Sequence, residues 1–230
     1  MPGYILHLTS ARMFLDRLPA ESPYRSDSQM RNDFYIGNLL PDAVSPKNAS
    51  HFYDPEFCDR MIVWPRTEVF LEKYRERMRD PVCLGYYYHL YIDKKFLKEY
   101  LPGVAEYYDR NGRRAQRKHE VSEVRLKRNG ERIPRDRYLS EEYYYGDYTK
   151  MNTYLCERYQ LPENLRADRE PAIEEVRGAD LEAVFEMIRE YRKVPAEAVR
   201  DVRVFDVEDL LDFLEEAADN MVSVLQGIVE

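Results

Sequence analysis

The spacing of apolar residues along the chain predicts a mainly helical protein. Apolar positions recur three and four residues apart in separate stretches, as they do when one face of each helix is buried. This pattern predicts helices over residues 4–18, 31–40, 67–79, 81–100, 140–159, 181–193 and 207–228. Polar or charged connections are expected at 20–32, 41–65 and 162–179.

Several side chains indicate where these helices begin and end. Pro81 suits the first turn of the helix over 81–100, and Pro102 is expected to end that helix because proline lacks an amide hydrogen. Ser140, Asp180 and Asp206 are predicted N-caps of the last three helices, since short polar side chains accept hydrogen bonds from free amides.

One segment departs from the helical pattern. Apolar and polar residues alternate on either side of Asn129-Gly130, a dipeptide that favours a tight turn between antiparallel strands. The sequence therefore predicts a small β-hairpin near 121–134, inserted in an otherwise all-α protein.

Length and composition suit one helical domain. The chain has 230 residues, of which 44% are hydrophobic, and we divide it into a core over 1–160 and a C-terminal helical part over 161–230. It contains no run of eighteen apolar residues and no basic stretch followed by an apolar one at its start, so we expect a cytoplasmic protein without a transmembrane segment. The three cysteines lie far apart, which favours unpaired thiols in a reducing compartment.

Charge is unevenly distributed around the net value of −8. Residues 110–137 hold eleven Lys or Arg against four Asp or Glu, whereas residues 161–230 hold eight against nineteen. The basic segment could attract an anionic substrate or could pair with the acidic C-terminal part, and the sequence leaves both interpretations open. Its charges are not dense enough on one face to predict binding to duplex nucleic acid.

Five residues have the chemistry of a metal site: His7, Asp42, His51, His89 and Asp93, which include three of only four histidines. His89 and Asp93 are four residues apart, so a helix would place them on one face. Neutral imidazoles and carboxylates together bind zinc, manganese or iron. The set could hold one ion with open positions or two ions that share a carboxylate, and a bound water would become a hydroxide nucleophile near neutral pH.

The order His, Asp, His, then His-x-x-x-Asp resembles the zinc-dependent phospholipase C family, over about residues 1–100 and less specifically over 140–160. The resemblance implies an all-α, phospholipase C/P1 nuclease-like helical bundle. It also implies that Asp93 bridges two zinc ions, with His7 on one ion and Asp42, His51 and His89 on the other. Asp42 is the catalytic candidate that the resemblance implies, as a carboxylate that helps to activate water.

The chain departs from the secreted members of that family in two respects. Those enzymes hold a third zinc through two further histidines and a glutamate spaced as His-x-x-x-Glu, but downstream of Asp93 this chain has only His119, followed directly by Glu120. We therefore expect no three-metal cluster and a solvent-exposed His119. Secreted members also use their N-terminal amine as a ligand, and whether the Pro2 amine could serve here is left open.

Tyrosine is unusually frequent, with twenty in the chain. Most are expected to pack as large apolar rings with one polar end. On the helix over 140–159, Asp147, Tyr148 and Asn152 are candidates to hold the ligands in place or to contact substrate.

Two functions of different classes follow from these residues. The first is a metal-dependent hydrolase of phosphoesters, most simply a zinc enzyme, acting on a small phosphorylated molecule or a phospholipid head group. The alternative is a non-catalytic helical binding module that the metal stabilises. Metal binding alone does not distinguish them.

Overall fold

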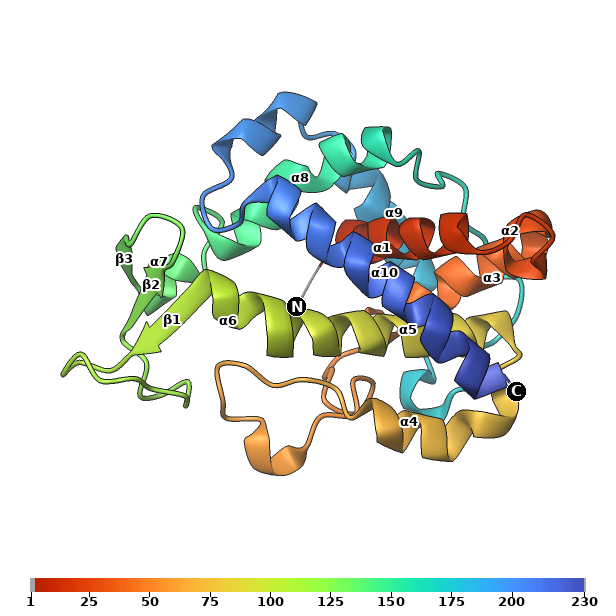
Figure 1. Ribbon diagram of the computed structural model, residues 1–230, viewed down its shortest axis with the longest axis horizontal. Helices are drawn as coiled ribbons and strands as arrows, with labels where there is room; N and C mark the ends of the chain where they lie inside the picture. The colour runs from red at the N-terminus through yellow and green to blue at the C-terminus, as the bar shows by residue number, and fades with distance from the viewer. Residues whose placement is uncertain (1–2, 230) are drawn as a thin grey trace.

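The computed structural model describes residues 3–229 and shows a mainly helical protein with a small antiparallel sheet at one end (Figure 1). The longer helices are α1 Tyr4–Arg17, α3 Ser28–Leu39, α5 Pro81–Lys95, α8 Tyr144–Arg158, α9 Leu181–Tyr191 and α10 Val207–Val229. The shorter helices are α2 Pro23–Ser26, α4 Thr67–Tyr74, α6 Leu101–Val104 and α7 Arg135–Tyr138. Single 3₁₀ turns lie at Leu40–Asp42, Pro55–Phe57, Arg75–Arg77 and Glu174–Val176, and a longer one spans Ala196–Asp201. The expectation of a mainly helical fold is confirmed.

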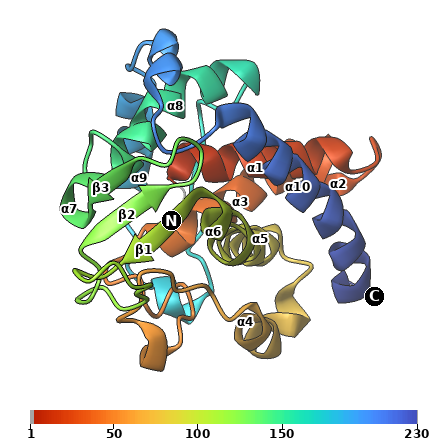
Figure 2. The ribbon, with the colours of Figure 1, turned by 60° about the vertical axis from the view of Figure 1, so that its left-hand side comes forward.

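Helix α5 is the centre of the structure. Figure 2 looks nearly along it and shows α3, α4 and α10 arranged around it. Every residue from Val82 to Asp93 is buried, because the sequence of α5 is apolar or aromatic on all sides. The polar residues His89 and Asp93 are therefore carried into the core by a helix that has no solvent face over most of its length.

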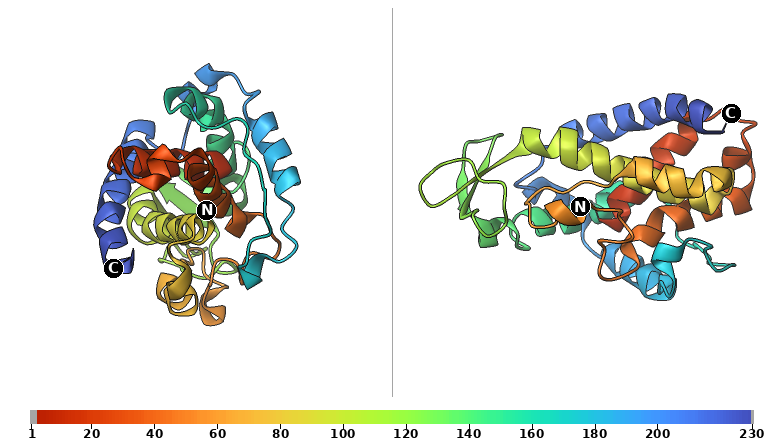
Figure 3. Two further views of the ribbon diagram at one scale, coloured as in Figure 1. Left: turned by 90° about the vertical axis from the view of Figure 1, so that its right-hand side faces the viewer. Right: turned by 90° about the horizontal axis from the view of Figure 1, so that it is seen from below.

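The predicted hairpin is present and belongs to a three-stranded sheet. Strands β2 Glu123–Leu126 and β3 Arg132–Pro134 pair antiparallel, with Val124 opposite Ile133, and β1 Ala105–Tyr108 pairs with the other edge of β2. Strand β1 was not predicted because it is only four residues long and follows a helix directly. Figure 3 shows the sheet projecting from one end of the helical body.

The prediction that Pro102 ends its helix was wrong. The helix passes from α5 through a π turn at Phe96–Tyr100 into α6, which contains Pro102 near its start and ends at Val104. A π turn widens the helix, and this leaves room for the proline ring where a regular α-helix would clash with it.

The prediction that Ser140 caps α8 was also wrong, because α8 begins only at Tyr144. Residues 140–143 form a turn that folds against Gly146, where a Cβ atom would lie 1.7 Å from the Glu141 carbonyl oxygen. The other two predicted caps are confirmed: Asp180 accepts a hydrogen bond from the amide of Ala183, and Asp206 accepts one from Asp209.

The basic segment over 110–137 pairs mainly with carboxylates close to it. Glu106 is surrounded by Arg114, Arg125 and Lys127, and the acidic groups of α10 pair instead with basic residues of α1 and α8, namely Arg17 and Arg158. Among residues 3–229, no ion pair joins the basic segment to α10. None of the helices described is long and apolar enough to cross a bilayer.

Candidate metal centre

The five predicted ligands converge in the core from four separate segments. His7 lies on α1, Asp42 ends the 3₁₀ turn after α3, His51 lies in the following loop, and His89 and Asp93 lie on α5. Asp42 is 8% exposed and the other four residues are at most 1% exposed. Two groups of three have ligand atoms close enough to surround an ion, and they share His89: His7, His89 and Asp93 form one, and Asp42, His51 and His89 form the other. Within each group the ligand atoms lie within 4.8 Å of one another.

Asp93 lies between the histidines. Its Oδ1 is 3.3 Å from Nε2 of His7, and its Oδ2 is 3.4 Å from Nε2 of His51 and 3.8 Å from Nε2 of His89. Asp42 lies on the other side of His51, with 3.4 Å between its Oδ1 and Nε2. Neither oxygen of Asp93 and neither nitrogen of His7 makes a hydrogen bond of ordinary geometry within the described part of the chain. Buried polar atoms in such positions are typical of metal ligands.

Backbone carbonyl groups fix the tautomers of two histidines. Nδ1 of His89 lies 2.8 Å from the carbonyl oxygen of Asn38, and Nδ1 of His51 lies 3.0 Å from that of Lys47. A carbonyl oxygen can only accept, so each Nδ1 carries the proton and each neutral ring keeps its lone pair on Nε2. The two Nε2 atoms face each other at 3.2 Å. Two lone pairs this close repel unless a cation or a proton lies between them.

The electrostatics of the cluster suit a neutral His89 beside ionised Asp42 and Asp93. Burial lowers the pKa of His89 to about 3, and neighbouring His7 acts in the same direction, against the opposing effect of Asp93 and Asp42. Burial alone would raise the pKa of Asp93, but the imidazoles of His7, His89 and His51 outweigh it and hold that pKa below its ordinary value. Burial likewise opposes ionisation of Asp42, whose pKa is nevertheless held well below the usual range by His51, His89 and Lys47. These protonation states are the ones that a divalent metal requires of its ligands.

The close approach of two helices brings the Asn38 carbonyl to His89. Helices α3 and α5 cross at Gly37 and Gly85, and a Cβ atom on either glycine would lie 2.0 Å from a backbone oxygen of the other helix. His7 reaches the same place from α1 and stacks on the His89 ring, with 3.7 Å between ring centroids and 10° between planes. Backbone packing therefore sets the position of the site as much as the ligands do.

A cavity of about 500 Å³ opens beside Asp42. The ten residues that line it come from the start of α1, the loop after α3, the region of α8 and the end of α9: Gly3, Tyr4, Asp42, Lys47, Glu141, Tyr145, Tyr148, Thr149, Asn152 and Tyr191. Two residues that the sequence singled out, Tyr148 and Asn152, thus share a cavity with a candidate ligand. Of the candidate ligands, Asp42 is among the residues that line the cavity, so a small molecule in the cavity would lie beside that carboxylate.

Sequence reasoning overlooked Lys47. Its Nζ atom lies 2.6 Å from Oδ1 of Asp42, and its carbonyl oxygen accepts a hydrogen bond from Nδ1 of His51. One residue therefore holds two candidate ligands. The spacing of four residues between Lys47 and His51 was visible in the sequence, but in a loop such spacing carries no geometric meaning.

Asp147, the third candidate on α8, has a different set of partners. Its carboxylate accepts hydrogen bonds from the backbone amides of Arg203, Val204 and Phe205, and Lys150 lies 3.1 Å from its Oδ1. These contacts tie the segment before α10 to α8. His119 is exposed, as predicted, with 68% of its side chain accessible, and Pro2 lies outside the described residues.

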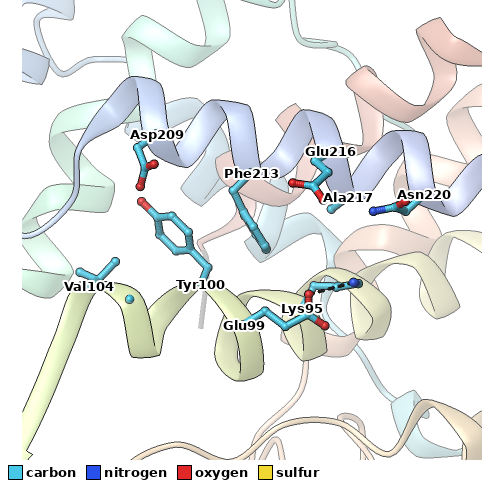
Figure 4. A pocket seen from close by; sticks show the side chains of 10 residues that line it. Lys95, Glu99, Tyr100, Val104, Asp209, Phe213, Glu216, Ala217 and Asn220 are labelled. Atoms are coloured by element: carbon cyan, nitrogen blue, oxygen red, sulfur yellow. Dashed lines mark hydrogen bonds and ion pairs between the residues drawn. The ribbon is translucent and has the colours of Figure 1, made fainter.

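Another cavity, of about 320 Å³, lies between α10 and the end of α5 (Figure 4). Its polar side chains include Lys95, Glu99, Asp209 and Glu216, and Lys95 pairs with Glu99 at 2.8 Å. Of the described residues that line it, none is a histidine or cysteine, so it lacks the ligand chemistry that the buried cluster has.

Comparison of the chain with protein-family models, with curated proteins and with solved structures found no match.

Proposed function

We propose that this chain is a metal-dependent hydrolase of phosphoesters. The observation that carries the proposal is the close approach of the Nε2 atoms of His51 and His89, which lie 3.2 Å apart beside the buried carboxylates of Asp42 and Asp93. A core that only needed packing would place apolar side chains there, because buried unpaired polar atoms destabilise a fold.

The residues fit a divalent ion, and zinc is the first choice because imidazole nitrogens and carboxylate oxygens are among its usual ligands. Manganese and iron accept the same donors. A single ion would be held either by His7, His89 and Asp93 or by Asp42, His51 and His89. With two ions, His89 would serve only one of them because it has one free lone pair, and Asp93 lies near enough to His7 and His51 to be shared. A bound metal supplies a Lewis acid for the phosphoryl oxygens and a hydroxide at neutral pH.

The chain's own groups contribute orientation and access. The carbonyls of Asn38 and Lys47 keep the two imidazoles turned so that Nε2 points into the centre. Asp42 belongs both to the ligand cluster and to the wall of the 500 Å³ cavity, so a substrate in that cavity reaches the centre at Asp42. The resemblance of the ligand order to zinc-dependent phospholipases C supports phosphoester chemistry as the reaction class.

The test combines elemental analysis with turnover. The purified protein is assayed for bound metal and then, loaded with zinc or manganese, against a panel of phosphomonoesters and phosphodiesters. Hydrolysis that disappears on chelation and returns with the metal supports the proposal. Stoichiometric metal without turnover of any substrate would instead favour the metal-stabilised binding module.

A further inference from the structure

Lys47 gives the cavity beside Asp42 a cationic group next to the proposed centre. Its Nζ is within 2.6 Å of Asp42 Oδ1, yet its side chain is 40% exposed whereas that of Asp42 is 4% exposed. An ammonium group has three donors, and one of them is used by Asp42. Lys47 is therefore both fixed in position and accessible to a molecule in the cavity.

The remaining lining of the cavity supplies neutral donors and acceptors. The tyrosines, Thr149 and Asn152 are uncharged, and Glu141, an exposed residue of the turn before α8, is the other charged residue of the wall. The carboxylate of Asp42 is already compensated by Lys47. This ammonium group would repel a cationic head group in the cavity, whereas it would attract an anionic phosphate.

We propose that Lys47 makes the site selective for dianionic phosphomonoesters, by donating a hydrogen bond to a terminal phosphate oxygen from the cavity wall beside Asp42. The inference rests on the proposed function and names its substrate class. Asp42 and Asp93 together carry two negative charges. Two divalent ions would bring more positive charge than that, and Lys47 adds a further positive charge. Such a centre favours a phosphate with two negative charges over a diester with one.

The first experiment measures anion binding without turnover. Metal-loaded protein is titrated calorimetrically at pH 8 with inorganic phosphate, which is mainly dianionic there, and with the monoanion dimethyl phosphate. Lys47→Met should weaken phosphate binding about ten- to a hundredfold, the loss typical of a hydrogen bond to a charged group, and should weaken dimethyl phosphate less. Lys47→Arg should retain most of the affinity because it keeps the charge.

The matched control is Lys73→Met. Lys73 on α4 is 39% exposed and its Nζ lies 2.7 Å from the Glu174 carboxylate, much as Lys47 lies beside Asp42, but no residue of α4 lines the cavity. This variant should bind phosphate like the wild type. Metal content is measured on every variant. If Lys47→Met binds phosphate as well as the wild type, or loses affinity only because it loses metal, the inference is overturned and Lys47 merely holds Asp42 in place.

The second experiment tests substrate class by comparing p-nitrophenyl phosphate with bis(p-nitrophenyl) phosphate. Wild type should prefer the monoester, and Lys47→Met should lower the ratio of the two kcat/KM values about tenfold or more. A wild-type preference for the diester, or an equal decrease for both substrates, overturns the inference. If fully loaded wild type hydrolyses neither, the proposed function fails, and the calorimetric result alone then decides whether Lys47 binds phosphate dianions.

Discussion

The carbonyl oxygen of Asn38 on α3 lies 2.8 Å from Nδ1 of His89 on α5, and this contact joins the packing of two helices to the chemistry of the site. It depends on Gly37 and Gly85, which let the two backbones approach. The contact fixes which nitrogen of His89 faces the other candidate ligands. A substitution at the helix crossing should therefore change the orientation of His89 in the candidate metal centre.

Gly85→Ala should destabilise the protein and weaken metal binding together. The new Cβ would lie 2.0 Å from the carbonyl oxygen of Phe34, a backbone atom that cannot move without shifting α3. Alanine in place of glycine normally stabilises a helix. Here we expect the free energy of unfolding to fall by about 1–3 kcal/mol, because the clash outweighs that gain. Thermal unfolding and a metal titration measure both effects.

Gly103→Ala on α6 is the control for this substitution. A Cβ atom on Gly103 would meet no atom of another element within 4 Å in the described part of the chain. This variant should therefore fold and bind metal like the wild type. A Gly85 variant that behaves in the same way would refute the coupling between the helix crossing and the centre.

Asp93→Asn should remove most of the bound metal and lower any metal-dependent hydrolysis by about a hundredfold or more. The amide keeps the shape of the side chain but lacks the charge, and Asp93 is the carboxylate nearest to three imidazoles. Elemental analysis and kinetics on the same preparation check this. His119→Gln, at an exposed position, should keep both metal and activity; a metal-depleted His119 variant would show that the site has been misassigned.

Chelation should lower the melting temperature by about 5–15 °C at metal concentrations well above the dissociation constant. Metal that binds only the folded state adds stability by mass action, and the buried cluster exists only in that state. Differential scanning calorimetry before chelation, after it and after zinc is restored measures the change. Identical melting curves with verified metal removal would contradict this prediction.

Asp147→Asn should reduce stability by about 2–4 kcal/mol and leave metal content unchanged. Its carboxylate accepts from three successive amides at 203–205, and an asparagine side chain would turn a donor toward some of them. Denaturant unfolding measures the loss, with Asp212→Asn on the exposed face of α10 as the control. Loss of metal without loss of stability would instead assign Asp147 to the metal centre.

The metal-free protein should become less stable as the pH falls from about 6.5. In the folded state His89 stays neutral, because its pKa is lowered from 6.5 to about 3. In the unfolded state His89 takes up a proton near pH 6.5. The unfolded state then binds more protons, so acid favours it. The lowered pKa values of Asp42 and Asp93 act in the same direction at still lower pH.

Melting temperatures of the chelated protein between pH 7.5 and 4 check this dependence. The exposed control His119→Gln should show the same slope as the wild type, and His89→Gln should show a shallower one. A wild-type melting temperature that is flat across this range would be inconsistent with a neutral, buried His89.

Much of this protein follows from the sequence alone. The spacing of apolar residues predicted the main helices, and Asn129-Gly130 marked the hairpin, because both signals are local and repeat at the period of the backbone. The scarcity of histidine, the order His, Asp, His and the His89-x-x-x-Asp93 spacing selected five residues that the fold brings together. Polar residues that a buried helix carries into the core need partners, and this requirement is already visible in the sequence of α5.

Only the tertiary structure revealed how the site is held. The carbonyls of Asn38 and Lys47 belong to the backbone, which has no signature in the sequence, and the Asn38 carbonyl comes into reach only because α3 crosses α5 at two glycines. Lys47 lies beside Asp42 because of the path of the loop that joins them. Asp147 accepts hydrogen bonds from three amides that are more than fifty residues away along the chain. Sequence patterns report the periodicity of single elements, whereas the direction of a lone pair depends on the packing between elements.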